Sequence, residues 1–304
     1  MSSLDITTRR RFLAAAAATG AFVRPTDRTV AADPPAAPGR FKKAVILGMV
    51  KGDMPVMDKF RLLKDLGFDG VEIEAHSGLD RDEVVRARDA TGLVIHGVVA
   101  GVLWKQQLSS NDAAVRAKAV ELLKGAVDEA KAYGATTVLT IPGVVNKETF
   151  YADAYRRSLE EIPKAIPHAA EAGVKLALEN VWNQFLLSPL EAARFVDELN
   201  APEVGWYFDA GNVVRCGWPE HWIAALGRRI LKVHIKEYSR KKQQEEGLWK
   251  GFDVELGEGD CDWPTVMKAL RDVGYAGWIT AEVPGGDRER LADIARRMDR
   301  IIAS

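Results

Sequence analysis

The sequence predicts an α/β protein with the fold of a (β/α)8 barrel, or TIM barrel, formed as one domain by residues 42–304. Short apolar runs alternate with segments of helical periodicity eight times, which is typical of a parallel sheet with helical crossovers. Eight such units also fit the length of a closed barrel. An open doubly wound sheet is the alternative. It predicts a glycine-rich phosphate turn after an early strand, and no G-x-G-x-x-G occurs there.

The first four units are bounded by residues that cap helices. Asp80 and either Asn111 or Asp112 can begin helices through side-chain hydrogen bonds. Gly92 and Gly134 follow the helical pattern and end it. The expected strands cover residues 44–50, 70–75, 93–99 and 137–141, and the expected helices 57–66, 80–91, 111–133 and 149–172. The last of these helices contains Pro163 and Pro167, which should bend or break it.

In the second half, the helices expected from residues 188, 218 and 262 open with proline in the first turn, where the missing N–H is not needed. A charged stretch from Ser239 to Asp260 is expected to be a solvated loop that covers the barrel mouth. The expected strands begin at residues 175, 204, 230 and 278, and the expected helices at residues 188, 218, 262 and 287.

Composition argues against nucleic acid as a partner. The formal net charge is -1 and the chain beyond residue 32 is mildly acidic, so it offers no broad basic surface. The two cysteines, Cys216 and Cys261, form neither a disulfide framework nor a zinc-finger spacing. Two free thiols are expected, with a single bridge as the alternative.

Residues 1–32 resemble a twin-arginine export signal. Arg9-Arg10-Arg11-Phe12-Leu13 precedes an alanine-rich stretch, and Val30-Ala31-Ala32 offers small residues for cleavage. Residues 33–41 follow as a proline-rich linker. The apolar part is too short for a stable membrane anchor. The expected location is periplasmic or extracellular; the alternative is a disordered arm that happens to contain arginines.

Four strand ends carry metal-ligand side chains: Glu179, Asp209, His234 and Glu282. In a barrel, residues at the carboxyl ends of strands line the active site, so these neighbours should meet. Three carboxylates and one imidazole suit Mn²⁺, Mg²⁺, Co²⁺ or Zn²⁺. The alternative is that they are separate polar strand ends capped by water.

Further motifs accompany these residues, and together they resemble a known family. The motifs are Leu178-Glu179-Asn180, Phe208-Asp209-Ala210-Gly211-Asn212, Val233-His234-Ile235-Lys236-Glu237, Leu256-Gly257-Glu258-Gly259-Asp260 and Ala281-Glu282. They resemble the sugar phosphate isomerase/epimerase group of the xylose isomerase-like TIM-barrel superfamily, over roughly residues 42–303. The resemblance implies that Glu179 and Glu282 are both metal ligands and the acid/base pair. It also makes a homo-oligomer an expected partner arrangement.

Nine residues are candidates for binding a carbohydrate substrate. Asn212 stands where several ketose epimerases of the resembling family have histidine, and Arg240 matches a substrate-contacting arginine in some members. For three of them a structural role is the alternative to substrate binding. His96 would be a satisfied structural histidine, Trp104 would pack in the core, and Glu258 would anchor its loop. The candidates are Glu74, His96, Trp104, Asn180, Trp182, Asn212, Lys236, Arg240 and Glu258.

The favoured function is a divalent-metal-dependent sugar isomerase or epimerase that acts on a ketose or keto-sugar through an enediolate. A metal on the carbonyl oxygen acidifies the neighbouring C–H, and a glutamate on each face can move the proton. The alternative is a lyase that cleaves 3-keto-glycosides by β-elimination after the same proton abstraction. A non-catalytic sugar-binding barrel is less favoured. So is an endonuclease, whose trinuclear zinc site needs more histidines.

Overall fold

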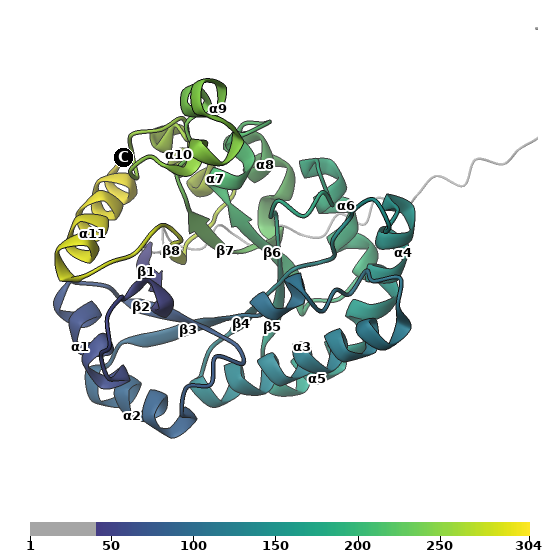
Figure 1. The fold of residues 1–304 in the computed structure, drawn as a ribbon, viewed down its shortest axis with the longest axis horizontal. Coiled ribbons are helices and arrows are strands. Elements are labelled where there is room, and N and C mark those ends of the chain that lie inside the picture. Colours follow the sequence, from purple (N-terminus) through teal and green to yellow (C-terminus); the bar gives the residue numbers. More distant parts are fainter. Residues whose placement is uncertain (1–40) are drawn as a thin grey trace, which may run out of the picture. The chain divides into compact units, whose positions relative to one another are not determined.

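The computed structural model describes residues 41–304 and confirms the closed barrel. Eight parallel strands follow one another in sequence order, and the last pairs with the first. Figure 1 shows helices around this ring of strands. The expected export signal, and all but the last residue of the expected linker, lie outside the described residues. The strands are β1 (Lys42–Ile46), β2 (Gly70–Glu74), β3 (Val94–Val99), β4 (Thr137–Thr140), β5 (Lys175–Glu179), β6 (Val204–Asp209), β7 (Ile230–Ile235) and β8 (Trp278–Ala281).

The helices begin and end largely where capping residues predict them. Asp80 and Asp112 accept hydrogen bonds from the first turns of their helices, and Gly92 and Gly134 take the left-handed conformation just past the ends. The α-helices are α1 (Val56–Asp65), α2 (Arg81–Thr91), α3 (Ala113–Tyr133), α4 (Tyr151–Glu161), α5 (Ile166–Ala172), α6 (Pro189–Leu199), α7 (Ala210–Val214), α8 (Pro219–Leu226), α9 (Arg240–Glu246), α10 (Trp263–Asp272) and α11 (Arg288–Ala303). Short 3-10 helices are η2 (Leu47–Met49), η3 (Gly101–Trp104), η4 (Ile162–Lys164), η5 (Gly227–Arg229) and η6 (Leu248–Phe252).

Two segments differ clearly from the sequence prediction, and one expected break is confirmed. β1 is shorter than expected because residues 47–49 form η2. The break expected at the two prolines is present, since η4 separates α4 from α5. The stretch from Ser239 to Asp260 was wrongly predicted to lack regular structure. Ser239 accepts a hydrogen bond from Lys242 N and caps α9, and η6 follows it.

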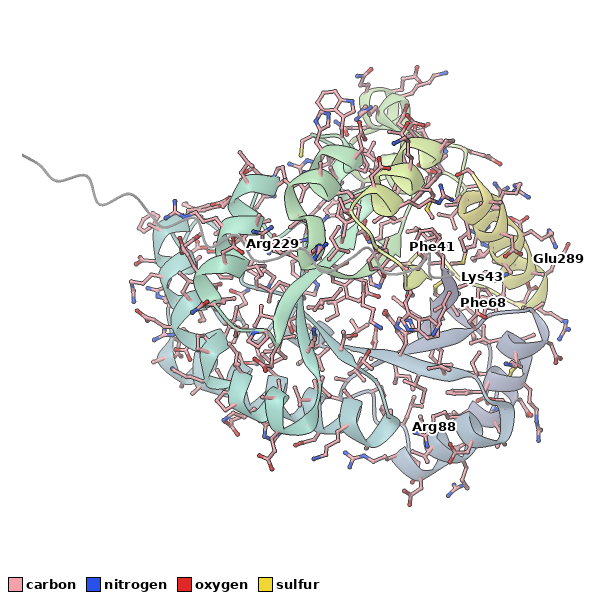
Figure 2. All side chains as sticks on the ribbon, turned by 180° about the vertical axis from the view of Figure 1, so that it is seen from behind. Phe41, Lys43, Phe68, Arg88, Arg229 and Glu289 are labelled. Carbon is pink, nitrogen blue, oxygen red and sulfur yellow. The ribbon has the colours of Figure 1, made fainter. Side chains whose placement is uncertain are left out.

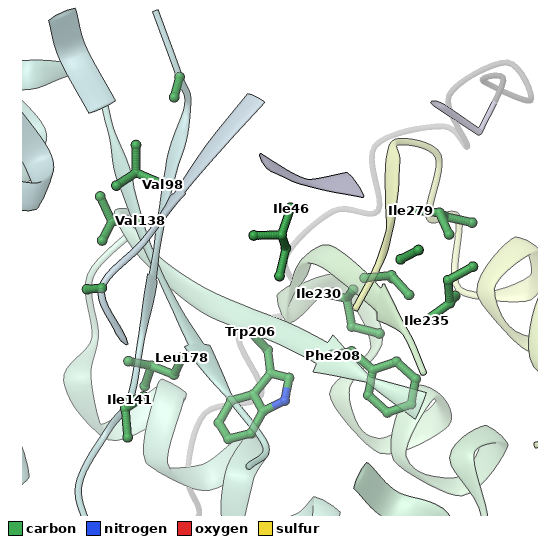
Figure 3. Close-up of a cluster of buried hydrophobic side chains, with 14 of the residues drawn as sticks. Ile46, Val98, Val138, Ile141, Leu178, Trp206, Phe208, Ile230, Ile235 and Ile279 are labelled. Carbon is green, nitrogen blue, oxygen red and sulfur yellow. The ribbon is translucent and has the colours of Figure 1, made fainter. Parts of the chain in front are cut away.

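The strands pack their outward side chains against the helices. Figure 3 shows part of this layer, including Leu178, Trp206 and Phe208, all buried. Successive strand residues face opposite sides of the sheet. Ala177, next to Leu178, and Tyr207, between Trp206 and Phe208, therefore face the barrel interior, where they belong to a second, smaller apolar cluster. Burying each large apolar side chain contributes about 1.5–3 kcal/mol. This outer layer therefore provides the stability that lets the interior hold polar groups.

Closure of the barrel brings the two ends of the described chain together. Lys43 on β1 is buried, and its ammonium donates to Asp299 Oδ1 on α11 at 2.8 Å. The same ammonium lies 5.5 Å from the ring centroid of Phe68, at the start of β2 (Figure 2). This contact ties the first strand to the last helix, as pairing of β1 with β8 requires.

The two cysteines are free, as expected. Cys216 is exposed and Cys261 is buried, and burial raises the pKa of the Cys261 thiol well above its usual range. Among residues 41–304, no helix combines the length and apolar character needed to cross a membrane.

Candidate active site

Four side chains predicted to bind a metal meet at the carboxyl ends of the strands. Glu179 and Asp209 are the last residues of β5 and β6, and Glu282 follows the last residue of β8. His234 lies one residue before the end of β7 and pairs in register with Asp209. One ligand atom from each of the four residues lies within 4.8 Å of the others. The structure therefore brings together the quartet expected from the strand ends.

The donor atoms of this quartet fit a divalent cation. Asp209 Oδ1 accepts a hydrogen bond from Asn212 N at 2.7 Å and caps α7, which fixes the carboxylate. Asp209 Oδ2 and Glu282 Oε2 are buried and accept no hydrogen bond from the described residues, although Lys236 Nζ lies 3.3 and 2.7 Å away. Buried oxygens without a donor are costly. A cation that prefers oxygen and imidazole ligands would satisfy them.

Burial and mutual repulsion shift the acidities of the quartet. Burial, the largest influence, raises the pKa of Glu179 to about 7 against the opposing effect of His234. Burial also raises the pKa of Asp209, although Lys236 opposes it. For Glu282, the ammonium of Lys236 and the imidazole of His234 outweigh burial and hold the pKa well below its usual range. A bound dication would favour the charged form of each carboxylate.

Glu72 orients His234 from inside the barrel. His234 Nδ1 lies 3.0 Å from Glu179 Oε1, and Nε2 lies 3.0 Å from Glu72 Oε2. Tyr207 OH donates to the other oxygen of Glu72. Burial alone raises the pKa of Glu72, but His234 and His96 outweigh it and bring this pKa to about 2. An ionised Glu72 accepts the Nε2 proton, which leaves Nδ1 facing the carboxylates as a ligand atom.

Sequence reasoning missed Glu72. The signal was present, since Glu72 is two residues before Glu74 on β2 and therefore on the same face of the strand. A carboxylate within an apolar strand that faces the barrel interior must have a buried partner. Here that partner is the histidine of the quartet.

Asn180 holds the end of β6 and does not line the cavity. Its Nδ2 donates to Asp209 O at 2.7 Å, and its Oδ1 accepts from Asp209 N and Trp206 Nε1, each at 3.0 Å. The side chain is buried beneath the quartet. The structure therefore places Asn180 as a support for the Asp209 backbone.

A cavity of about 750 Å³ opens above the quartet. Five of the predicted substrate-binding residues line it: Glu74, Trp104, Trp182, Asn212 and Lys236. Trp182 Nε1 donates to Asn212 O at 3.0 Å, which couples the loop after β5 to α7. Sequence reasoning missed the aromatic residues of η6, Trp249 and Phe252, which also line the cavity. Their segment had been interpreted as a featureless charged loop.

Three further predicted substrate-binding residues, besides Asn180, lie outside the lining of this cavity. His96 was predicted to bind substrate, but it lies within β3 and does not line the cavity. β3 continues to Val99, and the His96 ring stacks on Trp278 at 4.2 Å inside the barrel. Arg240 donates to the carbonyls of residues 214 and 217. Glu258 is mostly exposed and pairs with Arg297 at 2.7 Å.

Comparisons with known proteins agree with this fold. The model of the xylose isomerase-like TIM barrel family matches residues 60–302. L-ribulose-5-phosphate 3-epimerase UlaE of Escherichia coli (strain SE11) is 28% identical over 281 residues, which cover 83% of this chain and 94% of that protein. The structure of D-allulose 3-epimerase from Methylomonas sp. in complex with D-allulose matches with a TM-score of 0.67 at 22% identity, covering 86% of this chain and 97% of that one. An L-ribulose 3-epimerase structure matches with a TM-score of 0.72 at 20% identity, covering 86% and 94%. The two structural likenesses show the fold, and these homologues carry the names of isomerase-class enzymes.

Replacing quartet ligands should abolish metal binding. We expect Asp209→Asn and His234→Ala to lose Mn²⁺ on desalting, because the first replaces an anionic carboxylate with a neutral amide and the second removes the imidazole. Saturating Mn²⁺ should raise the melting temperature of the unsubstituted protein by about 5 °C or more, and that of neither variant. Metal content by mass spectrometry and thermal unfolding measure both effects. The exposed Asp253→Asn is the control, and a full metal complement in the quartet variants would rule out this site.

Glu72→Gln should weaken metal binding without removing a ligand. The amide keeps the volume but loses the charge that orients His234, so the Kd for Mn²⁺ should rise about 10- to 100-fold. Competition with a chelating dye measures the Kd. The control is Glu74→Gln, an exposed carboxylate two residues along the same strand, which should change the Kd by less than about threefold. Equal Kd values for Glu72→Gln and the unsubstituted protein would refute the orienting role.

Proposed function

Because the chain belongs to the xylose isomerase-like TIM barrel family, we propose that it is a divalent-metal-dependent sugar isomerase or epimerase acting on a ketose or keto-sugar. One observation carries the proposal: Glu179 and Glu282 reach the same cluster from β5 and β8, at the floor of the cavity. The sugar 3-epimerase names of homologues support this assignment.

The two glutamates supply the proton transfers. A divalent cation held by the quartet supplies Lewis-acid polarisation of the substrate carbonyl. One glutamate takes the proton from the carbon beside the carbonyl, and the C–H electron pair moves to give an enediolate. The other glutamate donates a proton from the opposite face. Return to the same carbon inverts its configuration, and return to the adjacent carbon gives the aldose–ketose isomer.

The surrounding residues position the sugar. Lys236 is held between Asp209 and Glu282, and these carboxylates raise its pKa above the usual range although burial opposes them. It therefore stays charged and faces the oxygens of the reacting carbons. Asn212 and Glu74 line the same cavity and offer hydrogen-bond partners for hydroxyl groups.

The proposal predicts hydrogen exchange that depends on both glutamates. The Mn²⁺-loaded full chain, incubated in D₂O with a panel of ketoses and keto-glycosides, should place deuterium beside the carbonyl, as NMR would detect. Glu179→Gln and Glu282→Gln should each slow the exchange by about 10²-fold or more, with metal content measured in parallel. Glu258→Gln, outside the cavity, should exchange at the normal rate.

The products distinguish the reactions. A new stereoisomer identifies an epimerase or isomerase, whereas release of the aglycone identifies the β-eliminating lyase. Absence of exchange with every compound, in protein that holds its metal, would refute the enolisation chemistry.

We also propose that residues 1–32 direct export by the twin-arginine route, on the motif of paired arginines, apolar stretch and small residues. An Arg9→Lys/Arg10→Lys variant should then accumulate unprocessed in the cytoplasm, because this route recognises the arginine pair. Fractionation and immunoblotting of cells expressing the full chain measure this. Normal processing of the variant would reject the proposal.

A further inference from the structure

We propose that the cavity takes an uncharged sugar carrying a second ring, a glycoside, and does not take a sugar phosphate. The inference rests on the proposed function, because it names the substrate class of the same site. Three features support it: the charge of the lining, the extent of the cavity beyond the quartet, and an aromatic wall formed by Trp249 and Phe252 of η6.

The lining is poor in cations. Among the described residues that line it, Lys236 is the one with a permanent positive charge, and it is already held by Asp209 and Glu282. Glu74, Glu179 and Glu237 also line the cavity. Phosphate groups are bound by arginines, lysines or helix N-termini. A phosphate dianion would add negative charge to a lining already dominated by carboxylates, even with a dication bound.

The cavity extends well beyond what one sugar ring at the quartet would fill. Its volume of about 750 Å³ lies in the range of sites for ligands of drug size. The lining also has an apolar part, which includes Leu139, Ile141, Val283 and Pro284. An uncharged ring buries apolar surface against such a lining, whereas a charged group would lose its hydration there.

Contacts with neighbouring residues fix the position of the aromatic wall. Trp182 lies 4.7 Å from Trp249 and 4.8 Å from Phe252 between ring centroids. Tyr238, buried three residues after the end of β7, donates to Leu248 O at 2.8 Å. Gly251 packs on the Tyr238 ring, where an added Cβ would clash with the ring carbons. Ring and backbone contacts therefore fix η6 above the barrel.

Two tryptophans of the lining are left uncovered. Trp249 is 67% exposed and Trp104 is 41% exposed. Flat aromatic faces stack on rings and bury large area at little entropic cost. A glycoside whose keto-sugar lies at the quartet would place its second ring against this wall.

Binding of unreactive glycosides to the Mn²⁺-loaded full chain tests the inference independently of turnover. By titration calorimetry, phenyl β-D-glucopyranoside should bind about tenfold or more tightly than methyl β-D-glucopyranoside, which is the effect of about 1.4 kcal/mol of stacking. Glucose 6-phosphate should bind no more tightly than glucose. Trp249→Ala should remove most of the phenyl preference, and Trp249→Phe should keep part of it. Trp218→Ala, a 55% exposed tryptophan outside the cavity, should keep it in full.

Equal affinities for the phenyl and methyl glycosides would overturn the inference, as would no binding of either, or tighter binding of the phosphate. The failures can be told apart. A phenyl preference without deuterium exchange on any substrate would support the ring site and refute the proposed reaction. Deuterium exchange with free ketoses, without a preference for the phenyl glycoside, would support the proposed reaction and refute the ring site.

Discussion

Repulsion among three carboxylates is the constraint on which the site depends. Glu179, Asp209 and Glu282 contribute oxygens to a cluster within 4.8 Å, and two unit charges 4 Å apart repel by about 4 kcal/mol at an effective dielectric constant of about 20. The closed barrel fixes the strand ends that carry them, so the carboxylates cannot separate. Positive charge must therefore be supplied at this point. The ammonium of Lys236 supplies part of it, and a divalent cation bound by the quartet would supply the rest.

The fold and the quartet were predictable because both follow from topology. Once eight strands close in order, the last residues of neighbouring strands must meet, and Asp209 and His234 need no further information to come together. His96 was misjudged because its position inside the predicted strand of residues 93–99 does not show which groups its side chain contacts. Arg240 has partners far along the chain, which no local pattern contains. To predict the role of Glu72, one must know which face of the sheet each strand residue occupies, and not only where the strand ends.

Polar side chains in the barrel interior form a network of contacts that reaches the quartet. Lys232 Nζ lies 3.4 Å from His96 Nδ1, and Thr280 Oγ1 lies 3.1 Å from His96 Nε2 and 3.4 Å from Glu72 Oε1. Burial lowers the pKa of Lys232 to about 8. Such groups would destabilise a barrel core unless each found a partner. The network gives these buried groups hydrogen-bond partners and includes Glu72. Because Glu72 contacts His234 Nε2, the same network also fixes the imidazole of the quartet.

The proposed catalytic groups and the proposed aromatic contacts to the substrate lie on different parts of the fold. The quartet and Glu72 lie on or at the ends of strands, whose positions the barrel dictates. Trp104, Trp182 and Trp249 lie on η3, on the loop after β5 and on η6, and such segments can change without disturbing strand register. Members of one family can therefore keep the same proton chemistry while the lining selects different substrates. The charge and shape of the loops, rather than the quartet, are the features from which the sugar should be inferred.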